Sequence, residues 1–252
     1  MVRKRLVTVL TFQDGVLFRT KMFQPDYRYT QNFVDASLID EIVALDISRS
    51  VPGRPAGRRD EFAAVIDRLA RRCFVPLATG GGIRTIEDVV WHMKRGADKV
   101  IVNSGAIDDP SLIGRIAQQY GSQCVVVSID AKSRPAGGWE VFADCGQRAT
   151  GLDVTSWAKR AQEEGAGEVF LTSIDRDGSL EGYDLDLSRR VADSLTIPVL
   201  ICGGAGNWQH FVDGVLIGGA SAVCTANIYH FTEASVQSAK KFMSSAGIPV
   251  RI

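Results

Sequence analysis

The sequence of 252 residues lacks the marks of membrane, secreted and metal-binding proteins. No apolar run is long enough to cross a bilayer, and Leu6–Leu10, after the basic start, is too short and too β-branched for a signal peptide. The five cysteines form no C-x-x-C pair and the three histidines are scattered, so neither a disulfide framework nor a metal site is indicated. Lys plus Arg (29) equals Asp plus Glu (29), so no net charge favours nucleic acid. We expect a cytoplasmic protein with reduced thiols, no metal, no cofactor, and neither a nucleic-acid nor a membrane partner.

The main positive feature is an internal repeat. Val75–Ile83 (VPLATGGGI) reappears, altered, as Ile197–Ala205 (IPVLICGGA), and each copy is followed by an amphipathic segment, a Gly-Ala pair and a second apolar run. Such an apolar run is typical of a buried parallel strand. Glycines at its carboxyl end allow a phosphate to approach the backbone. The two copies predict two phosphate sites that face each other.

Eight strand-like runs alternate with amphipathic segments. The runs are 5–11, 41–46, 75–79, 99–103, 124–130, 168–173, 198–202 and 222–225. Asp60–Arg72 is expected to be a helix, Thr85–Asp88 resembles a capping box, Phe23–Gln31 is interpreted as a loop, and Gly137-Gly138 indicates a hairpin. The alternation predicts a single-domain (β/α)8 barrel with half-barrels near 1–121 and 122–252. A doubly wound sheet is the alternative.

A carboxylate stands at the end of the fifth run, where barrel enzymes carry their chemistry. Asp130 follows an apolar stretch, so it either has a raised pKa and acts as a general acid or base, or caps a helix or orders a loop. The repeat aligns Thr11 with Asp130. A threonine hydroxyl is too weak an acid to do the work of a carboxylate at neutral pH.

Charged and small polar residues stand at the two ends of the predicted strands. Four charged residues stand at the amino-terminal ends: Arg5, Glu41, Lys99 and Glu168. Charges at strand starts are usually solvated. Because Glu41 and Glu168 are related by the repeat, the alternative is a ring of charges at the barrel floor. At the carboxyl ends, Asn103-Ser104 and Thr225–Asn227 occupy matched places where backbone N–H groups suit a phosphate. Asp177-Gly178 is interpreted as a tight turn.

Five segments together carry a family pattern: TGGGI at 79–83, GADKV at 96–100, SIDAK at 128–132, LTSIDRDG at 171–178 and GGAG at 203–206. Over essentially the whole chain, this pattern resembles the cyclase subunit of imidazole glycerol phosphate synthase. The resemblance implies a (β/α)8 barrel and a phosphorylated small-molecule substrate held between two phosphate anchors at the carboxyl face. It also implies a glutaminase subunit docked at the amino-terminal face, with ammonia passing through the barrel.

The resemblance also implies roles for individual residues. Asp130 matches the catalytic carboxylate, and Asp177 is a second candidate. One phosphate anchor would comprise Gly82, Asn103 and Ser104, and the other Asp177, Gly178, Gly204, Ala226 and Asn227. The ammonia gate would comprise Arg5, Glu41, Lys99 and Glu168, with Asp98 beside the docking face.

Several positions depart from the family pattern. The family's other acid/base aspartate falls at Thr11, its substrate-contacting lysine at Arg19, and its usual serine at Asn227. Phe23–Phe33 and Arg49–Arg59 also differ, at the substrate end of the first half-barrel. We expect a paralogue that keeps ammonia delivery but serves another acceptor, such as a surface-polysaccharide sugar. An authentic cyclase of histidine biosynthesis and a non-catalytic activator of a glutaminase are the alternatives.

Overall fold

Eight parallel strands close into a barrel in the computed structural model, which describes residues 3–28, 39–48, 60–72, 74–226 and 236–252. In order around the barrel they are β1 (Arg5–Gln13), β4 (Glu41–Asp46), β5 (Leu77–Gly80), β6 (Lys99–Val102), β7 (Val125–Ser133), β10 (Glu168–Ser173), β11 (Val199–Cys202) and β12 (Ala222–Thr225). β12 pairs with β1, and β7 with β10, so the sheet has no open edge within the ring. The predicted (β/α)8 barrel is confirmed, and a doubly wound sheet is excluded because the sheet closes on itself.

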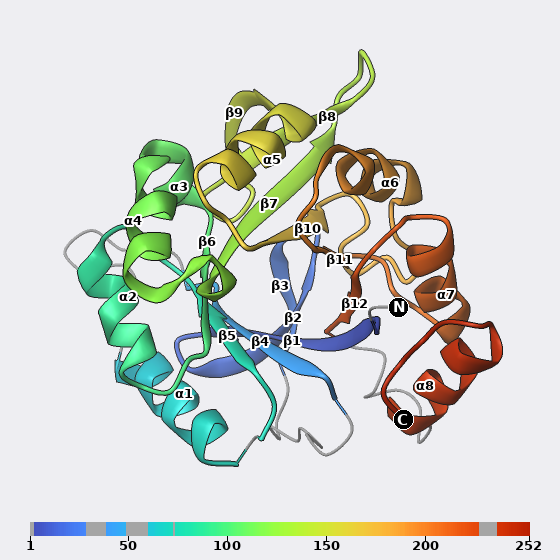
Figure 1. Ribbon diagram of the computed structural model, residues 1–252, viewed down its shortest axis with the longest axis horizontal. Helices are drawn as coiled ribbons and strands as arrows, with labels where there is room; N and C mark the ends of the chain where they lie inside the picture. The colour runs from blue at the N-terminus through green and yellow to red at the C-terminus, as the bar shows by residue number, and fades with distance from the viewer. Residues whose placement is uncertain (1–2, 29–38, 49–59, 73, 227–235) are drawn as a thin grey trace.

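Helices surround this barrel (Figure 1). They are α1 (Asp60–Arg72), α2 (Ile86–Met93), α3 (Ser104–Asp108), α4 (Ser111–Tyr120), α5 (Val154–Glu163), α6 (Leu185–Ser194), α7 (Trp208–Leu216) and α8 (Val236–Ser245), with a 3-10 turn at Ser122–Cys124. α1 has the predicted bounds. The predicted capping box at α2 is present, because the Thr85 hydroxyl accepts the Asp88 N–H while the Asp88 carboxylate accepts the Thr85 N–H.

Two antiparallel hairpins extend the barrel at its carboxyl face. They are formed by β2 (Val16–Lys21) with β3 (Gln24–Arg28), and by β8 (Trp139–Ala143) with β9 (Arg148–Asp153). The hairpin expected at Gly137-Gly138 is confirmed, since β7 pairs antiparallel with β8 across that turn. The predicted loop over Phe23–Gln31 is wrong for 24–28, which form β3. The turn before β3 contains no glycine, and its positive φ angles fall at Met22 and Phe23, so the usual turn signal is missing from the sequence.

The two half-barrels share the same strand register. Each register pair in the first half has a counterpart in the second, at positions that the sequence repeat aligns. The matched pairs are Val7–Glu41 and Val126–Glu168, Ile42–Leu77 and Val169–Val199, Ala78–Lys99 and Leu200–Ala222, and Val100–Val125 and Val223–Leu6. Because a one-residue slip would turn every side chain to the other face, repeat-related residues face the same way in both halves.

The core has two parts, one inside the barrel and one between the barrel and its helices. The inner part contains Val7, Val9, Val43, Ala78, Ile101, Val126, Phe170, Leu200, Ala222 and Cys224. Leu6 and Leu10 belong to the outer part, so β1 alternates between the two. This alternation directs Arg5 and Thr11 inward at opposite ends of β1.

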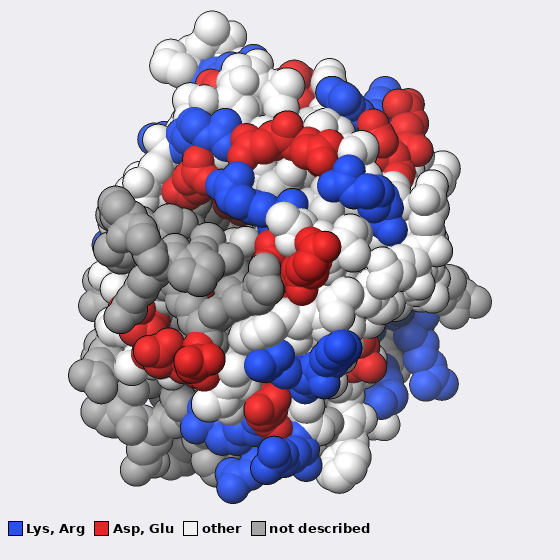
Figure 2. All heavy atoms as spheres, turned by 90° about the vertical axis from the view of Figure 1, so that its left-hand side faces the viewer, with Lys and Arg blue, Asp and Glu red and all other residues white. Residues whose placement is uncertain are grey.

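The outer surface is mixed in charge on the face shown in Figure 2, where basic and acidic side chains lie interspersed. None of the helices among the described residues is both long enough and apolar enough to cross a membrane. Asn227 and Arg49–Arg59 lie outside the described residues, as does the part of Phe23–Phe33 beyond residue 28.

Candidate functional site

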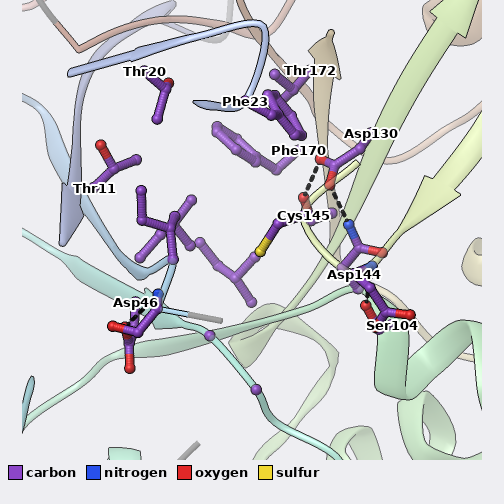
Figure 3. Close-up of a pocket in the computed structure, with 18 of the residues that line it drawn as sticks. Thr11, Thr20, Phe23, Asp46, Ser104, Asp130, Asp144, Cys145, Phe170 and Thr172 are labelled. Atoms are coloured by element: carbon purple, nitrogen blue, oxygen red, sulfur yellow. Dashed lines mark hydrogen bonds between the residues drawn. The ribbon is translucent and has the colours of Figure 1, made fainter. Parts of the chain in front are cut away.

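A cavity of about 440 Å³ lies at the carboxyl end of the barrel (Figure 3). It has the volume expected of a small-molecule site and stands where barrel enzymes hold their substrates. The structure brings together at this cavity most of the site residues expected from the sequence: Thr11, Gly82, Asn103, Ser104, Asp130, Asp177 and Ala226. Arg19, Gly178 and Gly204 do not line it, and Asn227 is outside the described residues.

Asp130 is buried at the carboxyl end of β7. Asn103 Nδ2 donates to Asp130 Oδ2 at 2.7 Å, and Ser128 Oγ lies 3.5 Å from Oδ1. Burial raises the pKa of the Asp130 carboxyl to about 7, an effect that the two donors reduce and the charge of Asp177 reinforces. The Asp130 carboxyl can therefore take up and release a proton near neutral pH.

Thr11 is buried at the matched position on β1, with a different set of contacts. Its hydroxyl donates to the backbone carbonyl of Phe18 on β2, with an oxygen–oxygen distance of 2.5 Å. Thr11 and Phe18 are also direct partners in the antiparallel pairing of these strands. The Thr11 hydroxyl thus supports the hairpin that begins on β1.

Asp177 connects this hairpin to the loop after β10. Its Oδ2 accepts the backbone N–H of Phe23 at 3.0 Å, and its backbone carbonyl accepts that of Met22 at 3.1 Å. Burial raises the pKa of the Asp177 carboxyl, while hydrogen bonds from Phe23 and Thr20 and the charge of Arg19 oppose the rise. Asp177 lines the cavity, but its carboxylate is engaged with the hairpin turn.

The residues of the first expected phosphate anchor converge on the cavity from neighbouring strand ends. Gly82 has a φ of 68°, which favours glycine, and it lies beside Asn103 and Ser104 in the cavity wall. The Ser104 hydroxyl accepts the backbone N–H of Asp144 at 2.9 Å, which ties the β8–β9 turn to this wall. The arrangement suits a phosphate because small residues leave the backbone accessible.

The glycines of the second expected anchor serve close packing between loops. A Cβ on Gly204 would lie 2.1 Å from the Gly182 carbonyl oxygen, and a Cβ on Gly178 would lie 2.7 Å from that of Thr20. Ala226, from the same expected anchor, lines the cavity. The described residues therefore bring one expected anchor wholly to the cavity and the other only in part.

An arginine–aspartate ring surrounds the β8–β9 turn. It joins Arg84 to Asp108 (2.6 Å) and Asp144 (3.3 Å), and Arg148 to Asp108 (2.8 Å) and Asp144 (2.7 Å). These ion pairs connect the loop after β5, the end of α3 and the turn itself. Their side chains are largely exposed, so each pair contributes little stability alone, and together they fix the turn beside the cavity.

The four charges expected at the barrel floor form a closed ring of ion pairs. Arg5 contacts Glu41 at 2.5 Å and Glu168 at 2.9 Å, and Lys99 contacts the same two carboxylates at 2.9 Å each. Burial lowers the pKa of the Arg5 guanidinium, but the carboxylates of Glu41 and Glu168 outweigh that effect and raise it. The ring closes the barrel at the end opposite the cavity. Asp98 stands beside it and accepts the backbone N–H of Leu77.

The structure adds cavity residues that the sequence reasoning missed: Thr20, Phe23, Asp46, Asp144, Cys145, Phe170 and Thr172. Asp46 could have been found, because it is a carboxylate directly after the apolar run of β4, as Asp130 is after that of β7. Cys145 could not, because a turn with positive φ at Asp144, Cys145 and Gly146 brings it to the cavity. Phe23 and Thr20 depend on the hairpin that was interpreted as a loop.

The model of a family described as histidine biosynthesis protein matches residues 7–235. The match covers β1 from residue 7 onward and the other seven barrel strands in full. It also covers the residues that line the cavity and every member of the floor ring except Arg5.

Proposed function

The chain belongs to the histidine biosynthesis protein family, and from that premise we propose that it is a barrel enzyme subunit supplied with ammonia by a glutaminase partner. Ammonia enters at the floor ring, passes along the barrel axis, and is used or delivered at the carboxyl-face cavity. The acceptor is a phosphorylated small molecule other than the histidine-pathway substrate, such as a sugar of a surface polysaccharide. The lyase reaction of the authentic cyclase is the main alternative.

One contrast carries the proposal. The floor ring is complete, with each charge bonded to two opposite charges, and this supports a gate for ammonia at the amino-terminal end. At the other end, position 11 holds a hydroxyl that is bonded to the Phe18 carbonyl, where the family's cyclase chemistry needs a second carboxylate. The complete floor ring together with an altered acid–base set favours the same nitrogen source and a different reaction.

The barrel interior supports passage of neutral ammonia. Above the ring the inward side chains are apolar, among them Val7, Ala78 and Val126. Moving an ion into such surroundings costs far more than moving a neutral polar molecule. An apolar interior therefore selects ammonia over ammonium once the ring has been passed.

Asp130 supplies the chemistry that an amination requires at the far end. When ammonia replaces the oxygen of a carbonyl-type carbon, two protons leave the nitrogen and two join the oxygen, which departs as water. A carboxyl whose pKa lies near 7 can carry these protons one at a time. Such a reaction proceeds with one acid–base residue, whereas the cyclase resemblance implies two.

The amino-terminal face has apolar side chains to meet a partner. Phe74, just before β5, is 98% exposed. Leu216 and Ile217, at the end of α7, are about half exposed. They lie at the same face as Phe74, because a barrel helix runs antiparallel to the strand before it. Exposed apolar groups on the same face as a charged ring have the composition of a docking surface.

The proposal is tested by turnover of the histidine-pathway substrate with ammonium salts at pH 8. We expect little or no product from the wild-type chain. Robust cyclisation would favour the authentic cyclase instead.

A second measurement separates catalysis from mere activation of a glutaminase. Asp130→Asn should abolish consumption of the true acceptor while the glutaminase of the complex continues to hydrolyse glutamine. If Asp130→Asn leaves every activity of the complex unchanged, the non-catalytic alternative is favoured.

A further inference from the structure

The Thr11 hydroxyl has a structural partner that a carboxylate cannot replace. It donates to the Phe18 carbonyl oxygen, and Thr11 is 8% exposed. An ionised aspartate has no proton to donate and would bring negative charge against that oxygen. Position 11 therefore has a donor requirement that belongs to the β1–β2 hairpin and not to acid–base chemistry.

The matched position in the second half-barrel shows what a carboxylate does in the same setting. Asp130 pairs with Phe142 across β7 and β8, as Thr11 pairs with Phe18 across β1 and β2. The Asp130 carboxylate takes donors from Asn103 and Ser128. When this carboxyl is ionised, both of its oxygens only accept hydrogen bonds, so in that state they cannot bond to the carbonyl of Phe142 as Thr11 does to that of Phe18.

The turn between β2 and β3, at the far end of β2 from β1, is attached to Asp177. Met22 and Phe23 both have positive φ angles, 48° and 61°, which are unfavourable for residues with side chains. The backbone N–H groups of these two residues bond to the Asp177 carbonyl and carboxylate. Thr11 at one end and Asp177 at the other thus hold the hairpin across the top of the barrel.

The hairpin held in this way forms one wall of the cavity. Thr20, Phe23 and Pro25 all line it. The Phe23 ring reaches the β8–β9 turn, since a Cβ on Gly146 would lie 3.0 Å from Phe23 Cδ2. Cys145, next to Gly146, also lines the cavity, and Figure 3 shows its side chain among the lining residues.

We propose that Thr11 is a positioning residue whose hydroxyl seats the β2–β3 hairpin over the cavity. This chain has thereby exchanged an acid–base position for a hairpin anchor. It follows that Thr11→Asp does not restore a second catalytic carboxylate, because the ionised side chain releases the hairpin from β1.

The reactivity of Cys145 provides a direct readout of the hairpin. We would treat the full chain with iodoacetamide at pH 8 and follow each cysteine peptide by mass spectrometry. Thr11→Val removes the donor with little change of shape, and it should speed alkylation of Cys145 by up to about tenfold, the factor for one net hydrogen bond. Thr11→Asp should also speed alkylation, and Thr11→Ser, which keeps the donor, should restore the wild-type rate.

The chain offers matched controls. Thr8→Val is the same replacement on the same strand at a buried residue, and it should leave the Cys145 rate unchanged. Cys124, just before β7, reports general thiol reactivity, and the buried Cys224 reports unfolding. If Thr11→Val unfolds the chain, alkylation of Cys224 shows it, and Thr11→Ala replaces it.

Hydrogen exchange over Val16–Lys21 and at Phe23 supplies an independent measurement. The proposal predicts faster exchange in Thr11→Val and Thr11→Asp, with Thr11→Ser like the wild type. Unchanged Cys145 alkylation and unchanged exchange in a folded Thr11→Val chain would overturn it. So would a Thr11→Asp chain that keeps the hairpin closed. Neither result bears on ammonia delivery, so this proposal and the proposed function fail separately.

Discussion

At the scale of the residue, Asp130 and Thr11 show how one backbone position can serve two purposes. Both lie at the carboxyl end of a matched strand, and both are buried. Asp130 meets side-chain donors inside the barrel, whereas Thr11 meets a backbone acceptor on the adjoining hairpin. The chemistry of the site therefore depends on which partner each side chain reaches.

The raised pKa of Asp130 has a consequence for stability. A carboxyl has a pKa of about 3.9 when unfolded, and that of Asp130 is about 7 when folded, so ionisation of this residue disfavours the folded state. The stability it contributes is fully present below about pH 4 and is lost as pH rises through 7, with an upper limit of about 4 kcal/mol. Asp130→Asn should therefore be more stable than the wild type at pH 8, by an amount that shrinks toward pH 4.

Urea unfolding of both proteins between pH 4 and 8 measures this difference. Asp186→Asn, at an exposed carboxylate on α6, is the control, and no such trend is expected for it. A stability difference between Asp130→Asn and wild type that does not change with pH would contradict the prediction.

At the scale of the element, the two hairpins are copies placed on the two matched strands. β1 and β7 each continue past the barrel rim and pair with the next strand, and a phenylalanine faces the matched residue in both. The copies differ in their turns: the first hairpin rests on the loop after β10 through Asp177, and the second is joined to the wall beside Ser104. The hairpins therefore shape the cavity from two sides.

Close packing of Gly178 against the first hairpin can be tested with two glycines of similar backbone angle. Gly178 has a φ of 71° and Gly151 of 75°, but only Gly178 has a carbonyl, that of Thr20, in the path of a Cβ. Gly151→Ala should lose about 1 kcal/mol from the unfavourable φ alone. Gly178→Ala should lose more, in urea unfolding, and should speed hydrogen exchange in the first hairpin. Equal losses would show that the hairpin does not press on Gly178.

At the scale of the whole molecule, the floor ring and the cavity lie at opposite ends of one barrel with an apolar interior between them. All four members of the ring come from strand starts, and Glu41 is 1% exposed. Pairing is what makes such burial of charge tolerable. The ring therefore ties the first and second half-barrels together by charge, since Arg5, Glu41 and Lys99 come from one half and Glu168 from the other.

Removing one ring charge should destabilise the barrel. Glu41→Gln leaves Arg5 and Lys99 to share Glu168, and we expect a loss of about 3 kcal/mol in the free energy of unfolding. Asp193→Asn, which breaks an exposed pair with Arg189, should change it by less than about 0.5 kcal/mol. Urea titrations at constant ionic strength compare the two, and similar small effects would indicate a solvated ring.

Phe74 should act as an anchor for the glutaminase partner. Phe74→Ser removes a fully exposed aromatic ring from the amino-terminal face, so it should weaken association with the proposed partner by at least tenfold, or about 1.4 kcal/mol, with little change in folding. Calorimetric titration with the glutaminase of the same organism measures the affinity. Leu180→Ser, at an exposed residue of the carboxyl face, is the control. Unchanged affinity for Phe74→Ser would place the docking surface elsewhere.

The sequence by itself determined the barrel, the half-barrel repeat and the placement of Asp130, Gly82, Asn103 and Ser104 around one end of it. These follow from the alternation of apolar runs and from the rule that parallel strands end at the same face, both of which depend on local pattern. The alignment of Glu41 with Glu168 in the repeat also predicted the floor ring, because residues that the repeat aligns share a strand register. The sequence further placed a threonine where a carboxylate was expected.

Only the tertiary structure decided what that threonine does. The Phe18 carbonyl lies opposite Thr11 because β1 runs past the barrel rim and turns back through Asp14-Gly15, both of which have positive φ angles. The Asp-Gly pair is a local turn signal, but the register that brings Phe18 to Thr11 is set by the strand pairing. The engagement of Asp177 with the hairpin, and the arrival of Cys145 at the cavity, likewise depend on contacts between segments far apart in the chain. Partners of this kind are set by how the elements pack, so they could not be read before the barrel was closed.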